Sequence, residues 1–95
     1  MPHPDADFPP TFCYRLLARK GAGVVPRVIE HFAKRDLVPA RFDCRAGTET
    51  LAIDVEVVGL DEAAARHIAR CLSGMVEMER VALTEKTVER SRARA

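Results

Sequence analysis

The feature that most constrains the fold is a short glycine-containing turn between an apolar strand and an amphipathic helix. The turn reads Lys20-Gly21-Ala22-Gly23 and follows a segment of alternating character at residues 12–19. In that segment Tyr14, Leu16 and Ala18 point to one side, as alternate residues of a strand do. After the first helix the sequence shows two further strand patterns, a second helical pattern and a last strand at residues 76–83. This order in a short chain predicts a βαββαβ domain.

Both helices are predicted from the spacing of their apolar residues and from the residues at their ends. The first helix should run from Val24 to about Lys34 or Arg35, with Pro26 tolerated in its first turn. The second should begin after Asp61 as its N-cap and end at Gly74. The periodicity predicts these buried stripes: Val25, Val28, Ile29 and Phe32 in the first helix, and Ala64, Ala65, Ile68, Cys71 and Leu72 in the second.

The two middle strands predict a β-hairpin with a loop at residues 46–49. This loop would place Arg41 opposite Asp54 and Phe42 opposite Ile53. The register gives one apolar face and one charged face, and a shift by a single residue would destroy both. The apolar face comprises Phe42, Cys44, Leu51, Ile53, Val55 and Val57. The opposite face of the sheet carries Arg15, Arg19, Arg41, Asp43, Arg45, Asp54 and Glu56.

These elements predict an α+β fold of the ferredoxin-like class, with a four-stranded antiparallel sheet and two helices on one face. Residues 12–83 form the predicted domain. The proline-rich residues 1–11 are expected to be a flexible arm, and residues 84–95 a polar tail. A chain of 95 residues buries only a modest core, and such a sheet has two open edges. We therefore expect a homodimer.

Composition excludes several classes of function. The net charge of +1 offers no general attraction to nucleic acid or to an anionic membrane. No apolar run approaches the roughly 18 residues of a membrane span, and the polar N-terminus is not expected to be a signal peptide. The three cysteines, Cys13, Cys44 and Cys71, have neither disulfide-framework nor CxxC spacing. We expect a protein of the reducing cytoplasm.

No constellation of catalytic or metal-ligating residues can be recognised. His31 and His67 lie on predicted helices without a ligand-spaced partner, so we expect no metal and no other cofactor. Pro26 occupies the third glycine position of a dinucleotide-binding fingerprint, which excludes that motif. Aromatic residues make up 5% of the chain, too few for a sheet that stacks RNA bases. We expect no catalytic residue.

The turn at Gly21-Ala22-Gly23 has two interpretations that the residues leave open. In one, the glycines serve a tight turn that needs a positive φ. In the other, backbone N–H groups at the helix N-terminus form a cradle for a carboxylate.

The segment from Gly23 to Arg35 resembles the first helix of an ACT domain. That family has a turn ending in glycine and then the pattern Gly-x-Leu-x-Arg-Val-x-x-x-Phe. The resemblance covers about residues 12–83. Within the family, the chain is similar to the short small regulatory subunit of acetolactate synthase, through residues 32–35 and the strand at 51–57. The matching positions are Gly23, Val25, Arg27, Val28 and Phe32.

The resemblance implies a non-catalytic regulatory domain that binds an amino acid effector, a catalytic partner, or both. The implied partner is a thiamine-diphosphate large subunit in branched-chain amino acid biosynthesis. Lys20 stands where effector-binding small subunits tend to carry Asn, and could meet a carboxylate as a point charge. The implied effector site comprises Lys20, Gly21, Ala22, Gly23, Val24 and Val25, and the implied partner surface comprises Arg27, Glu30, His31 and Lys34.

Two alternatives accompany this hypothesis. One is a stand-alone amino-acid-binding or structural dimer module with another partner. The other is an acylphosphatase-like hydrolase, because acylphosphatases share the βαββαβ order and use an arginine near the start of the first helix, as Arg27 is here. Their chemistry also needs an asparagine to orient water, and this sequence contains no asparagine.

Overall fold

The computed structural model describes residues 10–86. The predicted βαββαβ order is confirmed, as is the four-stranded antiparallel sheet with its two helices. The predictions for residues 1–9 and 87–95, the greater part of the expected arm and tail, lie outside the described residues. The elements are β1 (Thr11–Arg19), α2 (Val24–Ala33), β2 (Arg41–Ala46), β3 (Thr50–Val58), α3 (Glu62–Ser73) and β4 (Met78–Lys86).

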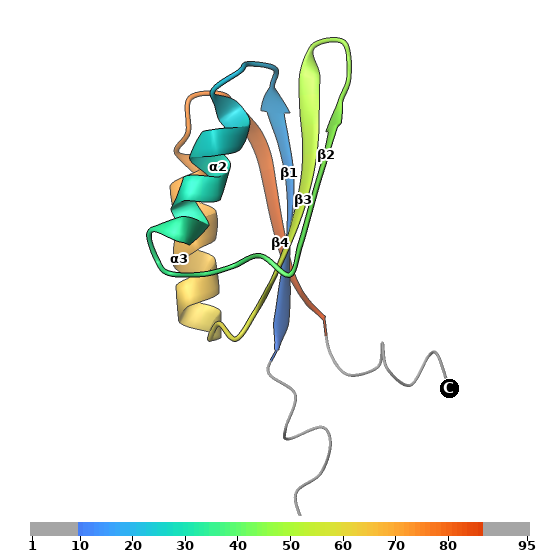
Figure 1. Cartoon of the computed structure of the whole chain (residues 1–95). Coiled ribbons are helices and arrows are strands. Elements are labelled where there is room, and N and C mark those ends of the chain that lie inside the picture. Colours follow the sequence, from blue (N-terminus) through green and yellow to red (C-terminus); the bar gives the residue numbers. More distant parts are fainter. Residues whose placement is uncertain (1–9, 87–95) are drawn as a thin grey trace, which may run out of the picture.

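The fold has two layers, with both helices on one face of a sheet whose strand order is β2-β3-β1-β4 (Figure 1). The core fills the space between these layers. The ring of Tyr14 meets that of Phe32 edge to face at 5.2 Å between centroids, a geometry that aromatic pairs favour. The Tyr14 hydroxyl donates a hydrogen bond of 2.9 Å to the backbone oxygen of Ala65, which joins β1 to α3.

Helix α2 begins at Val24 as predicted but buries a slightly different stripe. Its buried residues are Val24, Val28 and Phe32, spaced four apart. Ile29 was predicted to be buried and is 40% exposed, so that part of the prediction is wrong. The stripe of the helix that meets the sheet is centred on the three buried positions, and Ile29 lies about 100° around the helix from Val28.

Helix α3 begins as predicted, because the Asp61 carboxylate accepts a 2.7 Å hydrogen bond from the backbone N–H of Ala64. Gly74 ends the helix, but its φ of −80° is right-handed rather than the left-handed value common at glycine C-caps. The buried stripe narrows to Ala65, Ile68 and Leu72. The predicted members Ala64 and Cys71 are only partly buried.

The predicted hairpin register is wrong by two residues. Arg41 lies opposite Glu56 rather than Asp54, and Phe42 lies opposite Val55 rather than Ile53. The strands continue closer to the tip than predicted, so the loop is residues 47–49 and the Gly47 N–H donates to the Thr50 oxygen at 2.8 Å. A two-residue shift changes every partner but leaves every side chain on its own face.

The faces of the sheet therefore agree with the prediction better than the pairs do. Leu51, Ile53, Val55 and Val57 are buried beneath the helices, whereas Cys44 is exposed because β2 is an edge strand. The last strand runs to Lys86, beyond the predicted end at residue 83. None of the helices within residues 10–86 has the length and apolar character needed to cross a membrane.

Candidate functional site

The turn between β1 and α2 lies at the same end of the molecule as the β2–β3 loop (Figure 1). Two backbone hydrogen bonds attach its start to neighbouring segments. The Arg19 N–H donates to the Glu77 oxygen, and the Lys20 N–H donates to the Glu49 oxygen, both at 2.9 Å. The turn is therefore held between the hairpin loop and the segment that leads into β4.

The backbone at the start of α2 is accessible. Gly21, Ala22 and Gly23 are exposed, and Gly23 caps the helix without any side-chain hydrogen bond. The first N–H groups of a helix generally lack partners within the helix and carry partial positive charge. In α2 the Val24 N–H already donates to the Gly21 oxygen and Pro26 has no N–H, so the available donors are those of Val25 and of the preceding residues 21–23. An anionic group such as a carboxylate would find both donors and a favourable dipole here.

The first interpretation of the glycines, a need for positive φ, is wrong. Gly23 has a φ of −86°, and among the described glycines only Gly59 has a positive φ. A Cβ at Gly21 would meet Val24 at 3.6 Å, which is an ordinary contact. The two glycines instead leave the backbone of the turn uncovered by side chains.

Lys20 and the two valines of the predicted effector site have different environments. The Lys20 ammonium donates to the backbone oxygen of Gly47 at 3.0 Å and bridges the turn to the hairpin loop. Two further ammonium hydrogens remain on an exposed group. Val25 is partly buried. Val24 is completely buried, so only its backbone, which donates to the Gly21 oxygen at 3.2 Å, belongs to the turn.

Arg27 connects the turn to Glu77, a residue that the sequence reasoning missed. Its Nε donates to the Gly23 oxygen at 3.1 Å, and its Nη2 pairs with a carboxylate oxygen of Glu77. This hydrogen bond from Arg27 is the main reason that the pKa of Glu77 is lowered. The other oxygen, Oε1, is buried and has no hydrogen-bond partner within residues 10–86. No sequence motif marks Glu77, because only the tertiary fold brings it to the turn.

The four residues of the predicted partner surface do lie together. Arg27, Glu30, His31 and Lys34 line a pocket of about 160 Å³ with Met75, which follows α3. The Nδ1 atom of His31 is buried without a hydrogen-bond partner in the described part of the chain. Burial, and secondarily Lys34, lowers the His31 pKa. This surface is therefore a shallow, mainly basic depression beside the end of α3.

The described residues contain no group of three or more His, Cys, Asp and Glu side chains that could hold a metal ion. No disulfide bond joins cysteines within the described residues.

Residues 9–90 match the ACT-like domain family, and the chain belongs to that family. Domains of this family are typically regulatory modules that bind amino acids and do no chemistry themselves. No curated protein matches the sequence of this chain.

The fold is similar to that of several solved structures. One is the ACT domain of the GTP pyrophosphokinase of Chlorobium tepidum, with a TM-score of 0.70 and 9% identity over 78% of this chain and 96% of that one. The C-terminal domain of MgtC from Mycobacterium tuberculosis has a TM-score of 0.68 and 15% identity, over 85% of this chain and 92% of that one. A homoserine dehydrogenase from Thiobacillus denitrificans has a TM-score of 0.67 and 12% identity, over 85% of this chain and 18% of that one. At such identities the likeness concerns the fold.

Proposed function

We propose that this chain is a regulatory ACT domain that binds a free amino acid at the β1–α2 turn and acts on a separate catalytic subunit. One observation carries the proposal: the exposed amides of the turn lie beside the Glu77 carboxylate. The same Arg27 guanidinium bonds both the Gly23 oxygen and Glu77, so donors and an acceptor adjoin within one small site.

The two halves of this site complement an amino acid zwitterion. The α-carboxylate would accept from the exposed N–H groups of residues 21–23 at the positive end of α2. The α-ammonium would donate to the Glu77 carboxylate. Its Oε1 is buried and has no protein partner among the described residues, so the side chain, which is 24% exposed, would turn to present this oxygen to the ligand. A buried acceptor without a partner is costly, and an ammonium supplies the missing hydrogen bond. Lys20 adds positive charge on the carboxylate side.

The proposed partner is the thiamine-diphosphate large subunit of acetolactate synthase, in the branched-chain amino acid pathway of the cytoplasm. Support comes from the resemblance of residues 32–35 and 51–57 to the short small subunit of that enzyme. The depression at Arg27, Glu30, His31 and Lys34 would contact the large subunit. Strands β2 and β4 are the sheet edges, and a homodimer would cover at least one of them. Light scattering measures the dimer, and adding the chain to purified large subunit should change acetolactate formation.

A thermal-melt screen against the twenty amino acids tests the effector site directly. We expect a dose-dependent rise in melting temperature with valine, leucine or isoleucine. A ligand at about 100 times its Kd adds roughly 2.7 kcal/mol of stability, which shifts a domain of this size by many degrees. Glu77→Gln should strongly reduce the shift because it removes the negative charge that faces the ammonium, although an acceptor oxygen remains. Glu79→Gln, at an exposed neighbour on β4, should retain it.

Two outcomes would contradict the effector site. One is the absence of a shift with every amino acid at millimolar concentration. The other is an equal shift in Glu77→Gln and in the unsubstituted chain, which would place the ligand elsewhere. Circular dichroism of each variant checks that it is folded before the comparison is made.

A further inference from the structure

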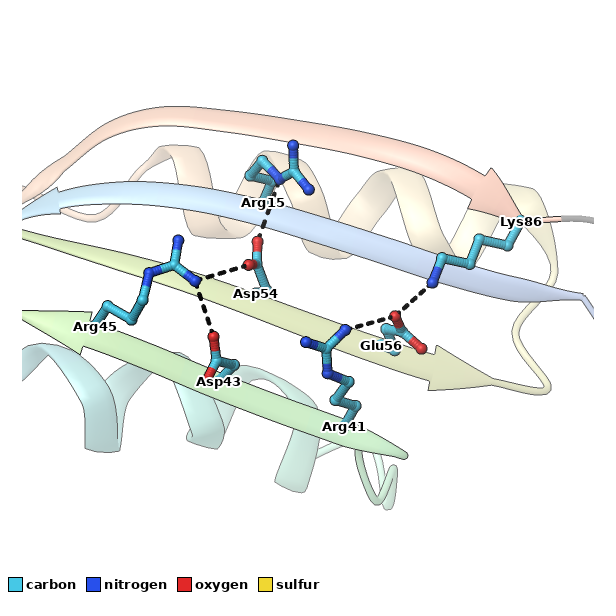
Figure 2. Close-up of polar contacts among 7 residues, drawn as sticks. All are labelled: Arg15, Arg41, Asp43, Arg45, Asp54, Glu56 and Lys86. Atoms are coloured by element: carbon cyan, nitrogen blue, oxygen red, sulfur yellow. Dashed lines mark hydrogen bonds and ion pairs between the residues drawn. The ribbon is translucent and has the colours of Figure 1, made fainter. Parts of the chain in front are cut away.

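The face of the sheet opposite the helices carries a network of ion pairs (Figure 2). Glu56 accepts from Lys86 Nζ at 2.7 Å and from Arg41 Nη1 at 3.3 Å. Asp54 accepts from Arg15 Nε at 3.3 Å, and Arg45 Nη1 lies 4.0 Å from its other oxygen. Each of these two carboxylates therefore lies between two cations.

Positive charge exceeds negative charge on this open face. The strand register and the alternation of side chains place six basic residues on it and three acidic ones, leaving aside Glu79, which lies at the bulge of β4 and has no partner on β1. The whole chain has a net charge of only +1, so the excess is local to this face. The basic residues are Arg15, Arg19, Arg41, Arg45, Arg80 and Lys86, and the acidic residues are Asp43, Asp54 and Glu56.

A hollow of about 290 Å³ lies within this face. Its lining includes the small side chains of Cys13, Ala82 and Thr84, the three cations Arg15, Arg41 and Lys86, and the two carboxylates Asp54 and Glu56. Cys13 pairs with Thr84 on β4 and with Glu56 on β3, so the small residues occupy neighbouring positions of the pleated surface. Long basic side chains therefore surround the small side chains of Cys13, Ala82 and Thr84 at the bottom of the hollow.

The arginines of this hollow have hydrogen-bond donors that the protein does not use. The Arg15 side chain is 84% exposed and uses only Nε on Asp54, while Arg41 is 59% exposed and uses only Nη1 on Glu56. Within residues 10–86 the other guanidinium nitrogens of both arginines have no side-chain acceptor. The two carboxylates already accept from cations. A ligand that supplies acceptors can use the free guanidinium donors, and guanidinium groups match planar or tetrahedral oxyanions especially well.

We propose that the open face of the sheet binds a small oxyanion in this hollow. The chemistry is that of a phosphate group or of a closely spaced pair of carboxylates, held by Arg15, Arg41 and Lys86. The attraction comes from the positive excess of the face and from the unused guanidinium donors, because the hollow itself contains three cations and two carboxylates. The site lies on the face away from the helices, so it is independent of the effector site at the β1–α2 turn.

A titration followed by two-dimensional NMR of the ¹⁵N-labelled chain tests this proposal. Inorganic phosphate and succinate are the two probes, and added sodium chloride holds the ionic strength constant because screening weakens such contacts. We expect saturable shifts of the Cys13, Ala82 and Thr84 amides with at least one probe. Binding of phosphate alone identifies a phosphate ligand, and binding of succinate alone identifies a dicarboxylate.

Three variants locate the site. The double variant Arg15→Gln, Arg41→Gln should weaken binding at least tenfold. Ala82→Leu keeps every charge but fills the bottom of the hollow, so it should also weaken binding, which diffuse attraction to a basic face would not show. Arg70→Gln, an exposed position on α3, should bind normally. Shifts that do not saturate with either probe, or that are the same in Ala82→Leu and the unsubstituted chain, would overturn the proposal.

Discussion

At the scale of single residues, Tyr14 is notable because it places a polar hydroxyl group inside the apolar core. Its side chain is fully buried, and its hydroxyl finds a partner in the backbone of the opposite layer. Burial raises its pKa to about 12, and the positive charge of Arg35 opposes part of that rise. The phenol thus acts as a buried neutral donor that joins β1 to α3.

Replacing Tyr14 with phenylalanine should reduce stability by about 1 kcal/mol, the typical net value of one hydrogen bond. That corresponds to roughly 4–8 °C in melting temperature for a domain of this size, measured by thermal circular dichroism. Because Tyr14 is the sole tyrosine of the chain, tyrosinate absorbance reports it alone. An absorbance midpoint near pH 10 rather than 12, in a chain still folded, would contradict the buried hydrogen bond.

The residues of the candidate site differ in whether local sequence patterns can predict them. The exposed turn and the cluster of Arg27, Glu30, His31 and Lys34 follow from local order, since turn residues adjoin and residues three or four apart share a helix face. Glu77 is 50 residues from Arg27 in the chain, and no local pattern could reveal their pairing. The ionisable group most suited to an amino acid ligand was therefore the one that sequence reasoning missed.

At the scale of the elements, each helix begins where its end signals predict. For α3 the signal is Asp61, whose carboxylate satisfies an N–H that would otherwise lack a partner. For α2 the cap is Gly23, which provides no side-chain acceptor. This difference leaves the start of α2 open to a ligand, while the start of α3 is closed by its own chain.

Asp61→Ala should destabilise the domain by about 1 kcal/mol because it removes this cap. Asp61→Asn retains an acceptor oxygen and should lose only a fraction of that amount. Urea unfolding followed by circular dichroism measures both variants. An equal loss in the two would show that the charge of Asp61, rather than its capping hydrogen bond, stabilises α3.

The hairpin shows which part of strand pairing local patterns can predict. Alternation assigned the strands of residues 41–46 and 50–58 to the correct faces, because alternation is a property of each strand alone. The register depended on the loop, and the structure closes it more tightly than predicted, with residues 47–49 outside the strands. Arg41 consequently pairs with Glu56 instead of Asp54. This pairing places both residues in the lining of the hollow on the open face.

At the scale of the whole molecule, the open face depends on ion pairs that join all four strands. Glu56 is central because it accepts from Arg41 on β2 and from Lys86 on β4, the two edges of the sheet. These contacts lower the pKa of Glu56, with the hydrogen bond from Lys86 as the largest cause. Ionised Glu56 thus links strands that are distant in sequence.

The lowered pKa of Glu56 predicts a pH dependence of stability with a definite sign. Above the ordinary value of 4.5, ionised Glu56 contributes its full stabilisation. As the pH falls below 4.5 and through the lower pKa of the folded state, the unfolded chain binds the proton more readily and this contribution is lost. Denaturant unfolding should show Glu56→Gln less stable than the unsubstituted chain at pH 7. A difference that persisted undiminished at pH 2 would contradict this role.

The sequence by itself determined the order of the elements, the starts of both helices and the faces of the strands. These properties depend on residues within a few positions of one another, through caps and periodicity. Only the tertiary structure decided the hairpin register, the exposure of Ile29 and the placement of Glu77 beside Arg27. Each of these depends on how separate segments pack, and packing energies are sums over contacts between residues far apart in the chain. The proposed effector and anion sites both take their decisive groups from such contacts.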